Sequence, residues 1–202
     1  MSRRRYRLGR RAEAAAATRR RIVEATIQVH DEQGITRTSV RDVAHRAGVS
    51  PATVLNHFPD MRDLVRACGQ LSSEQFPMPT EAVAAGARDA ADAVRLAARA
   101  LFTWWEQMGP GWDHLQIDRR TLPEVDAWLL DVDRRHRALV ARAAGDDVPE
   151  SVISVLTALT SRGAWQSLHA SGLDPEQAAA EVARVFTGSV SGRPSRTRRQ
   201  LH

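Results

Sequence analysis

The chain has 202 residues, 43% of them hydrophobic, and a formal net charge of +5 at pH 7. This length suits a small module joined to a larger body, and the composition is that of a globular protein and excludes a disordered or collagen-like chain. No apolar run approaches the roughly 20 residues that span a bilayer, and no apolar segment follows the Arg-rich N-terminus as in a secretory signal. We therefore expect a cytoplasmic protein without a membrane span.

The positive charge is concentrated in the first third of the chain. Residues 1–70 hold 14 Arg against 7 Asp plus Glu, a net charge of +7, whereas residues 71–192 hold 11 Arg against 17 Asp plus Glu, a net charge of −6. A basic N-terminal third suits phosphate groups, and the acidic remainder has no electrostatic reason to bind nucleic acid.

Both ends of the chain are basic tails. Residues 1–11 hold six Arg and residues 191–202 hold four. Neither tail has apolar periodicity, so we expect both to be disordered. A basic arm beside a DNA-binding module can lie along the nucleic-acid backbone or in the minor groove, and it can equally be a solvated tail.

Three helices are predicted within residues 12–58. The first ends at Gly34. Ser39 followed three residues later by Asp42 has the arrangement of a capping box, so a second helix begins there, and Gly48 stops it. Ser50 before Pro51 predicts the N-cap of a third helix. Two short helices joined by a turn that contains glycine are the pattern of a helix-turn-helix.

The helix that starts at Ser50 has two different faces. At about 100° per residue, Val54 and Phe58 share one side, and Ala52, Thr53 and Asn56 lie opposite. A small, polar outer face fits against base edges in a major groove, where Asn pairs with adenine and methyl groups contact thymine. A solvated face on an ordinary helical hairpin would have the same pattern.

Residues 19–65 resemble the N-terminal domain of the TetR family of ligand-responsive transcriptional repressors, through VAHRAGVS at the turn and ATVLNHFPDMRDLV after it. Leu55 and Met61 depart from the pattern, because many members have Tyr and Lys there, and both changes remove a backbone contact. The resemblance implies a homodimer whose last two helices pair with their copies across a two-fold axis. The DNA-contacting residues that it implies are Thr38, Ser39, Arg41, Ser50, Ala52, Thr53, Leu55, Asn56 and His57.

The remaining chain is predicted to be helical throughout. A connecting helix occupies residues 60–76, and Cys68 on its apolar face is expected to be a core residue rather than a reactive thiol. The prolines at 77 and 79 mark the module boundary. Residues 80–190 form the predicted ligand-binding and dimerisation domain. Its expected helices cover residues 80–108, 112–120, 123–144, 150–170 and 174–187.

All five Trp lie in the C-terminal two-thirds of the chain. A helical bundle with aromatic side chains and a few polar groups can enclose an apolar small molecule, although the same residues can be plain core. The resemblance adds the expectation of a regulatory ligand. The candidate pocket residues are Phe102, Trp105, Met108, Trp112, Gln116, Trp128 and Trp165.

An enzyme is the less favoured class. His114 and Asp118 share one helix face, and Asp131, Asp133 and His136 lie close along another, but the sequence holds no HExxH, CxxC, GxSxG or P-loop motif. We expect no catalysis, no cofactor and no bound metal. The sequence thus predicts an all-α protein in which an N-terminal three-helix DNA-binding domain is followed by a helical bundle. We expect it to act as a repressor that binds a pseudo-palindromic operator and is released by a small, largely apolar effector. The alternatives are a sequence-indifferent architectural DNA binder and a helical metal-dependent enzyme.

Overall fold

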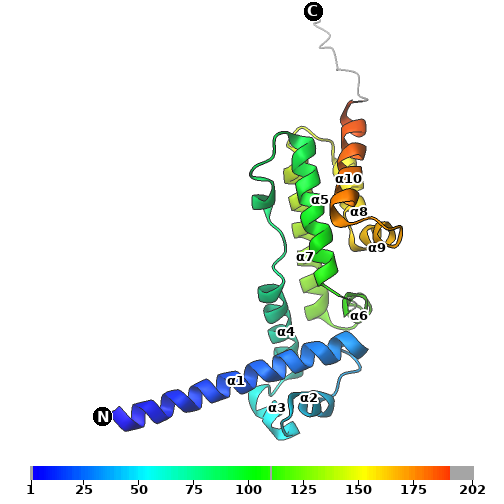
Figure 1. Cartoon of the computed structure of the whole chain (residues 1–202). Helices are drawn as coiled ribbons and strands as arrows, with labels where there is room; N and C mark the ends of the chain where they lie inside the picture. Colours follow the sequence, from blue (N-terminus) through cyan, green and yellow to red (C-terminus); the bar gives the residue numbers. More distant parts are fainter. Residues whose placement is uncertain (1, 110, 192–202) are drawn as a thin grey trace, which may run out of the picture. The chain divides into compact units, whose positions relative to one another are not determined.

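The computed structural model describes residues 2–109 and 111–191, which form helices joined by short loops (Figure 1). This described part contains no strand, which confirms the predicted all-α fold class. None of its helices has the length and the apolar character that crossing a bilayer requires. The chain divides into two compact units. The first contains Met1–Pro77 and Met108–Leu130, and the second contains Met78–Gln107 and Asp131–His202.

The first unit has a core formed by its four N-terminal helices. These are α1 (Ser2–Gln33), α2 (Val40–Ala47), α3 (Pro51–His57) and α4 (Met61–Gln75). α1 packs against both α2 and α4, and α2 packs against α3. The apolar positions that the sequence assigns to the inner faces of these helices are buried. The buried cluster consists of Ile22, Val23, Ala25, Val43, Ala44, Ala47, Val54, Phe58, Leu64, Ala67 and Cys68.

α1 is longer than the sequence predicts. It begins at Ser2, so the prediction of a disordered tail over residues 1–11 is wrong for residues 2–11. Arg and Leu are good helix formers, and extending an existing helix adds one hydrogen bond per residue without a new nucleation cost. Residues 9–17 are all exposed, so this part of α1 lies outside the core. The second predicted tail lies outside the described residues from position 192 onward.

Two later segments complete the first unit. α6 (Gly111–Asp118) contacts α1, and α7 (Pro123–Ala144) begins in this unit. The compact units therefore divide the chain differently from the predicted domains, because residues 108–130 group with the N-terminal helices and not with the rest of 80–190.

The second unit contains the other helices and the later turns of α7. They are the 3-10 helix η1 (Glu81–Ala84), α5 (Ala90–Gln107), α8 (Glu150–Leu159), α9 (Arg162–Ala170) and α10 (Pro175–Ser191). α5 lies along α10. The two helices are joined by ion pairs from Arg95 and Arg99 to Glu176.

Two predicted helices are interrupted in the second unit. The helix expected from residue 80 starts at Ala90 instead, where the carboxylate of Asp89 accepts a 2.8 Å hydrogen bond from the Asp92 amide. The helix expected over residues 150–170 is two helices, because Ser161 caps α9 by accepting a 3.3 Å hydrogen bond from the Ala164 amide. In both places a side-chain cap competes with continuation of the helix.

Candidate nucleic-acid interface and adjoining cavity

The start of α2 is fixed by a capping box. The Asp42 carboxylate accepts a 2.9 Å hydrogen bond from the Ser39 amide, and Ser39 Oγ accepts a 3.3 Å hydrogen bond from the Asp42 amide. The Ser39 hydroxyl, which donates to the Asp42 carboxylate at 2.6 Å, and the Ser39 amide lower the pKa of that carboxyl below its usual range. The predicted capping box is therefore confirmed, and it holds Ser39 at the exposed end of α2.

The turn between α2 and α3 depends on Gly48. Its φ is +63°, in the left-handed region, and its amide donates to the carbonyls at the end of α2. Ser50 then caps α3 by accepting a 3.1 Å hydrogen bond from the Thr53 amide, and Pro51 occupies the first helical position. A left-handed residue that ends one helix, followed after one residue by a new cap, gives the sharp turn of a helix-turn-helix.

α3 buries one face and exposes the other as its sequence predicts. Val54 and Phe58 are 0% and 1% exposed, whereas Ala52 and Asn56 are exposed. Leu55 is 45% exposed and lies at the border of this outer face. Asn56 makes no hydrogen bond in the described part of the chain, so its amide is free to pair with another molecule.

The nine predicted DNA-contacting residues lie at two neighbouring places in the first unit. Thr38, Ser39 and Arg41 lie at the start of α2, and the other six lie on α3 and its cap. Arg41 is exposed and forms no ion pair among the residues that the structure describes. Thr38 is partly buried and donates a 2.7 Å hydrogen bond to the Gly34 carbonyl.

Two arginines of the same module have partners within the unit. Arg46 donates to both carboxylate oxygens of Glu32, at 2.9 and 2.6 Å, and thereby joins α2 to α1. The guanidinium of Arg19 lies 4.5 Å from the ring centroid of Phe58, within the range of a cation–π interaction. Arg46 and Arg19 therefore stabilise the packing of the three-helix core. The sequence alone did not indicate this role.

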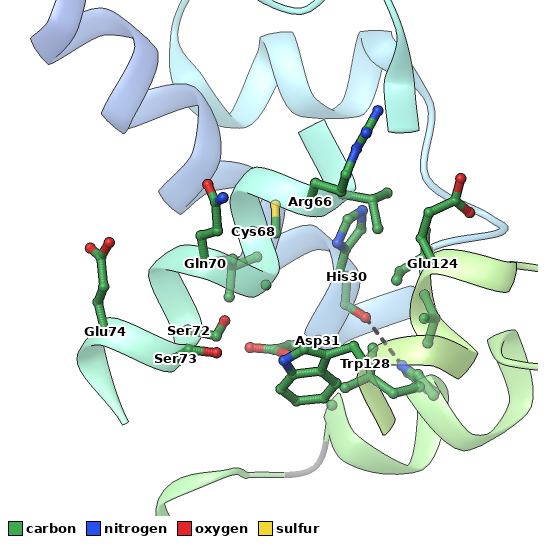
Figure 2. A pocket seen from close by; sticks show the side chains of 18 residues that line it. His30, Asp31, Arg66, Cys68, Gln70, Ser72, Ser73, Glu74, Glu124 and Trp128 are labelled. Carbon is green, nitrogen blue, oxygen red and sulfur yellow. Dashed lines mark hydrogen bonds between the residues drawn. The ribbon is translucent and has the colours of Figure 1, made fainter. Parts of the chain in front are cut away.

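The first unit also contains a cavity of about 660 Å³, shown in Figure 2. Its wall is formed by the C-terminal half of α1, by α4, by α6 and by the start of α7. Several large apolar side chains line it, among acidic, basic and hydroxyl groups. The apolar side chains are Ile27, Ile35, Val65, Leu115, Val125 and Trp128.

Three titratable groups at this cavity are shifted by burial. Burial lowers the pKa of His30 to about 4, although the charge of Asp118 raises it slightly. The Nε2 atom of His30 is buried and has no hydrogen-bond partner in residues 2–109 and 111–191. Burial also raises the pKa of the Asp31 carboxyl. Cys68 is buried with its pKa raised to about 12, so its thiol is protonated and unreactive at neutral pH, as expected of a core cysteine.

Residues 22–68, which include α2, α3 and the core beneath them, match the family model of the bacterial regulatory proteins of the TetR family. Within the chain, this segment is a TetR-family DNA-binding domain. This match confirms the resemblance seen in the sequence, and it assigns residues 22–68 to the module of a transcriptional regulator rather than of an enzyme. No curated protein matches the sequence.

Solved structures share the TetR-family fold with this chain. A TetR-like transcriptional regulator from Rhodococcus sp. RHA1 is 13% identical, with 88% of this chain and 98% of that chain covered and a TM-score of 0.65. The multidrug binding protein EbrR is 22% identical in complexes with imidazole and with malachite green. These two comparisons cover 89% and 84% of this chain, 98% and 96% of EbrR, with TM-scores of 0.57 and 0.52. At these identities the likeness concerns the fold.

The residues considered for an enzyme have structural partners in this chain. The Asp118 carboxylate accepts hydrogen bonds from the Ile35 amide and the Thr36 hydroxyl, both at 2.6 Å. His114 Nδ1 lies 3.3 Å from the His30 carbonyl oxygen, and His136 Nε2 lies 2.8 Å from the Thr160 hydroxyl. No cluster of three His, Cys, Asp or Glu side chains suited to a metal occurs in the described part of the chain.

The predicted pocket residues are divided between the two units. Phe102, Trp105 and Trp165 belong to the core of the second unit, where the rings of Phe102 and Trp165 stack with centroids 5.1 Å apart. The Trp105 indole donates a 2.9 Å hydrogen bond to the Thr160 carbonyl. Met108, Trp112, Gln116 and Trp128 belong to the first unit, and of all seven only Trp128 lines the cavity described above. Sequence reasoning missed the other lining residues because they come from four separate segments.

Proposed function

We propose that this TetR-family regulator is a repressor that binds a pseudo-palindromic operator as a homodimer and is released by a small, largely apolar effector. The observation that carries the proposal is the outer face of α3, where Ala52, Leu55 and Asn56 are exposed on a helix whose other face is buried. An exposed leucine beside an exposed amide offers base edges an apolar contact together with a paired donor and acceptor.

The proposed DNA contacts divide into base contacts and backbone contacts. Asn56 offers the paired donor and acceptor that recognise adenine, and the methyl groups of Ala52 and Leu55 suit thymine. Arg41 and the start of α2, at Thr38 and Ser39, suit phosphate oxygens. Leu55 replaces the Tyr of many family members, so it exchanges a phosphate contact for an apolar base contact.

The proposed dimer uses the later helices of the second unit. α8 packs against α10, and each carries an exposed valine, Val155 at 49% and Val185 at 45%. Pairing these faces with a second copy would bury the valines in a four-helix bundle. The two copies of α3 must then lie about 34–36 Å apart to enter successive major grooves.

The proposed effector control is supported by the cavity in the first unit and by the EbrR complexes. EbrR was solved with two small molecules, imidazole and malachite green. In this chain a cavity of about 660 Å³ falls in the size range of small-molecule sites and is bounded by α1 and α4. A coupling of about 1–3 kcal/mol between effector and operator would change operator affinity about 5- to 150-fold, and DNA would weaken effector binding by the same factor.

Selection from random duplex DNA followed by footprinting tests this function. We expect a pseudo-palindrome with half-sites about one helical turn apart, protected by two protomers. Leu55→Glu places a carboxylate on the exposed face without disturbing the core, and it should abolish binding to the selected site. A steep salt dependence without any preferred sequence would instead identify an architectural binder and overturn the proposal.

A further inference from the structure

The cavity in the first unit carries an uneven charge. Its lining includes the carboxylates of Asp31, Glu74 and Glu124 against the single guanidinium of Arg66. Arg66 is held by Asp63 at 2.6 Å, and Glu124 lies 3.6 Å from Arg62. Asp31 and Glu74 form no ion pair among the described residues, and the charge of Asp31 is opposed only at longer range, by His114 of the same wall.

The Asp31 side chain lies close against Gly111 at the start of α6. A Cβ atom added at Gly111 would lie 1.9 Å from Asp31 Oδ1, so only glycine allows the carboxylate to occupy this position. Figure 2 shows the Asp31 carboxylate pointing toward the part of α4 that carries Ser72 and Ser73, beside the indole ring of Trp128. A carboxylate, two hydroxyls and an aromatic ring at one end of a cavity are the groups that bind an organic cation.

The remainder of the wall suits the apolar part of such a molecule. Ile27 and Ile35 come from the first helix and the loop after it, and Leu115 and Val125 come from the other two segments. His30 is 8% exposed, and its burial keeps the imidazole neutral, so it adds no positive charge that would repel a cation. Asp31 is an exposed residue whose carboxyl is partly desolvated at the cavity wall, which raises its pKa, and a bound cation would favour the ionised form.

We infer that this cavity binds an aromatic ammonium compound, with the ammonium group at Asp31, Ser72 and Ser73 and the aromatic part against Trp128. This inference rests on the proposed effector control and names the chemical class of the effector. The bound molecule would touch α1 through Asp31 and α4 through Ser72. Both helices contribute to the core on which α3 packs, so the ligand acts on the DNA-binding module from within its own unit.

The test compares two probes of the same shape on the DNA-free, full-length protein. Naphthylethylamine is protonated at pH 7, whereas naphthylethanol has the same skeleton and is neutral. Isothermal titration calorimetry should show the amine binding at least about tenfold more tightly than the alcohol, the value of one charge-assisted hydrogen bond. Equal affinities, or no binding of either probe, would overturn the inference.

Matched variants locate the ammonium group. Asp31→Asn keeps the shape that fits against Gly111 and removes the charge, so the affinity for the amine should fall at least about tenfold while that for the alcohol stays the same. Glu106→Gln, an exposed residue that is not part of this cavity wall, should change neither affinity. An unchanged affinity for the amine in the Asp31→Asn variant would contradict the placement.

A second measurement separates this inference from the proposed function. Operator occupancy is followed while the amine is added to wild-type protein and to the Asp31→Asn variant. Binding of the amine without loss of operator would leave the cation site standing and refute effector release by this class. Release that is equally strong in both proteins would support effector control and refute the site at Asp31.

Discussion

The carboxylate of Asp118 on α6 accepts a 2.6 Å hydrogen bond from the hydroxyl of Thr36, 82 residues earlier in the chain. The same carboxylate accepts a second bond from the Ile35 amide, and it is 3% exposed. Through this one side chain α6 is joined to the loop that leads from α1 into α2. The helix-turn-helix is therefore supported by a segment that the sequence places in a different domain.

Asp118→Ala should destabilise the first unit by about 1–3 kcal/mol, because it removes two hydrogen bonds and leaves the Ile35 amide without its acceptor. Urea unfolding followed by circular dichroism measures the change. Asp147→Ala, at an exposed position in the loop after α7, serves as the control and should lie within about 0.5 kcal/mol of wild type. Equal stabilities of the two variants would show that the bonds to the loop contribute nothing.

Asn56→Ala and Arg41→Ala should weaken operator binding in different ways. Loss of the Asn56 amide should cost about 1–3 kcal/mol at one base pair and relax the preference there. Loss of the Arg41 charge should weaken binding to all sequences and lower the salt slope by about 1, and His57→Ala should likewise act mainly on backbone contact. Binding to a set of single-base operator variants at several salt concentrations separates these effects. An even loss across that set for Asn56→Ala would show that the residue does not recognise a base.

Gly48→Ala should destabilise the turn by about 1–2 kcal/mol through backbone strain, since φ is +63° and no atom lies within 4 Å of an added Cβ. Gly163→Ala is a matched control. Gly163 lies within α9 without a positive φ and also has open space around it, so alanine there should stabilise the helix by about 0.5–1 kcal/mol. Thermal unfolding should therefore show shifts of opposite sign.

Folding stability should fall as the pH drops from about 6.5 to about 4. Burial lowers the pKa of His30 and of His136 to about 4, so in this range the unfolded chain binds protons that the folded chain does not. Each histidine therefore lowers the free energy of unfolding by up to roughly 1.4 kcal/mol for each pH unit between about 6.5 and about 4. Above about pH 6.5 this stability is fully retained. Urea unfolding at several pH values should give a shallower slope for His136→Gln than for wild type, and identical slopes would refute the role of His136.

Val185→Glu should convert the proposed dimer to monomers, because a carboxylate on α10 cannot be buried at low cost in a bundle with a second copy. Sedimentation velocity measures the mass. The control is Ile117→Glu on α6, a residue that is 65% exposed but lies outside the proposed interface. A dimer that survives Val185→Glu and dissociates with Ile117→Glu would place the interface elsewhere.

The module around α2 and α3 was predictable because its signals are local. Ser39 with Asp42, Gly48, and Ser50 with Pro51 each specify a helix end through bonds to residues at most four positions away. The inner and outer faces of α3 follow from helical spacing alone. The family resemblance, which rests on the same residues, was confirmed for that reason.

The cavity was not predictable in the same way. Asp31, Ser72, Gly111 and Trp128 are far apart in sequence, and no periodic pattern relates them. Two of the tryptophans that suggested a pocket, Trp105 and Trp165, are core residues of the second unit, where each is 4% exposed. The breaks before Ala90 and at Thr160 were missed because capping by Asp89 and Ser161 outweighs an apolar pattern that continues through them.

α1 is one continuous helix, and the cavity lies near its C-terminal end. Its 32 residues, at a rise of about 1.5 Å each, give a rod about 48 Å long. Asp31 and His30 lie in its last turn, and Arg10 and Arg11 lie more than five turns away. A tilt of only about 5° at the ligand would move Arg10 and Arg11 by about 3 Å, enough to lengthen a hydrogen bond to a phosphate beyond its range.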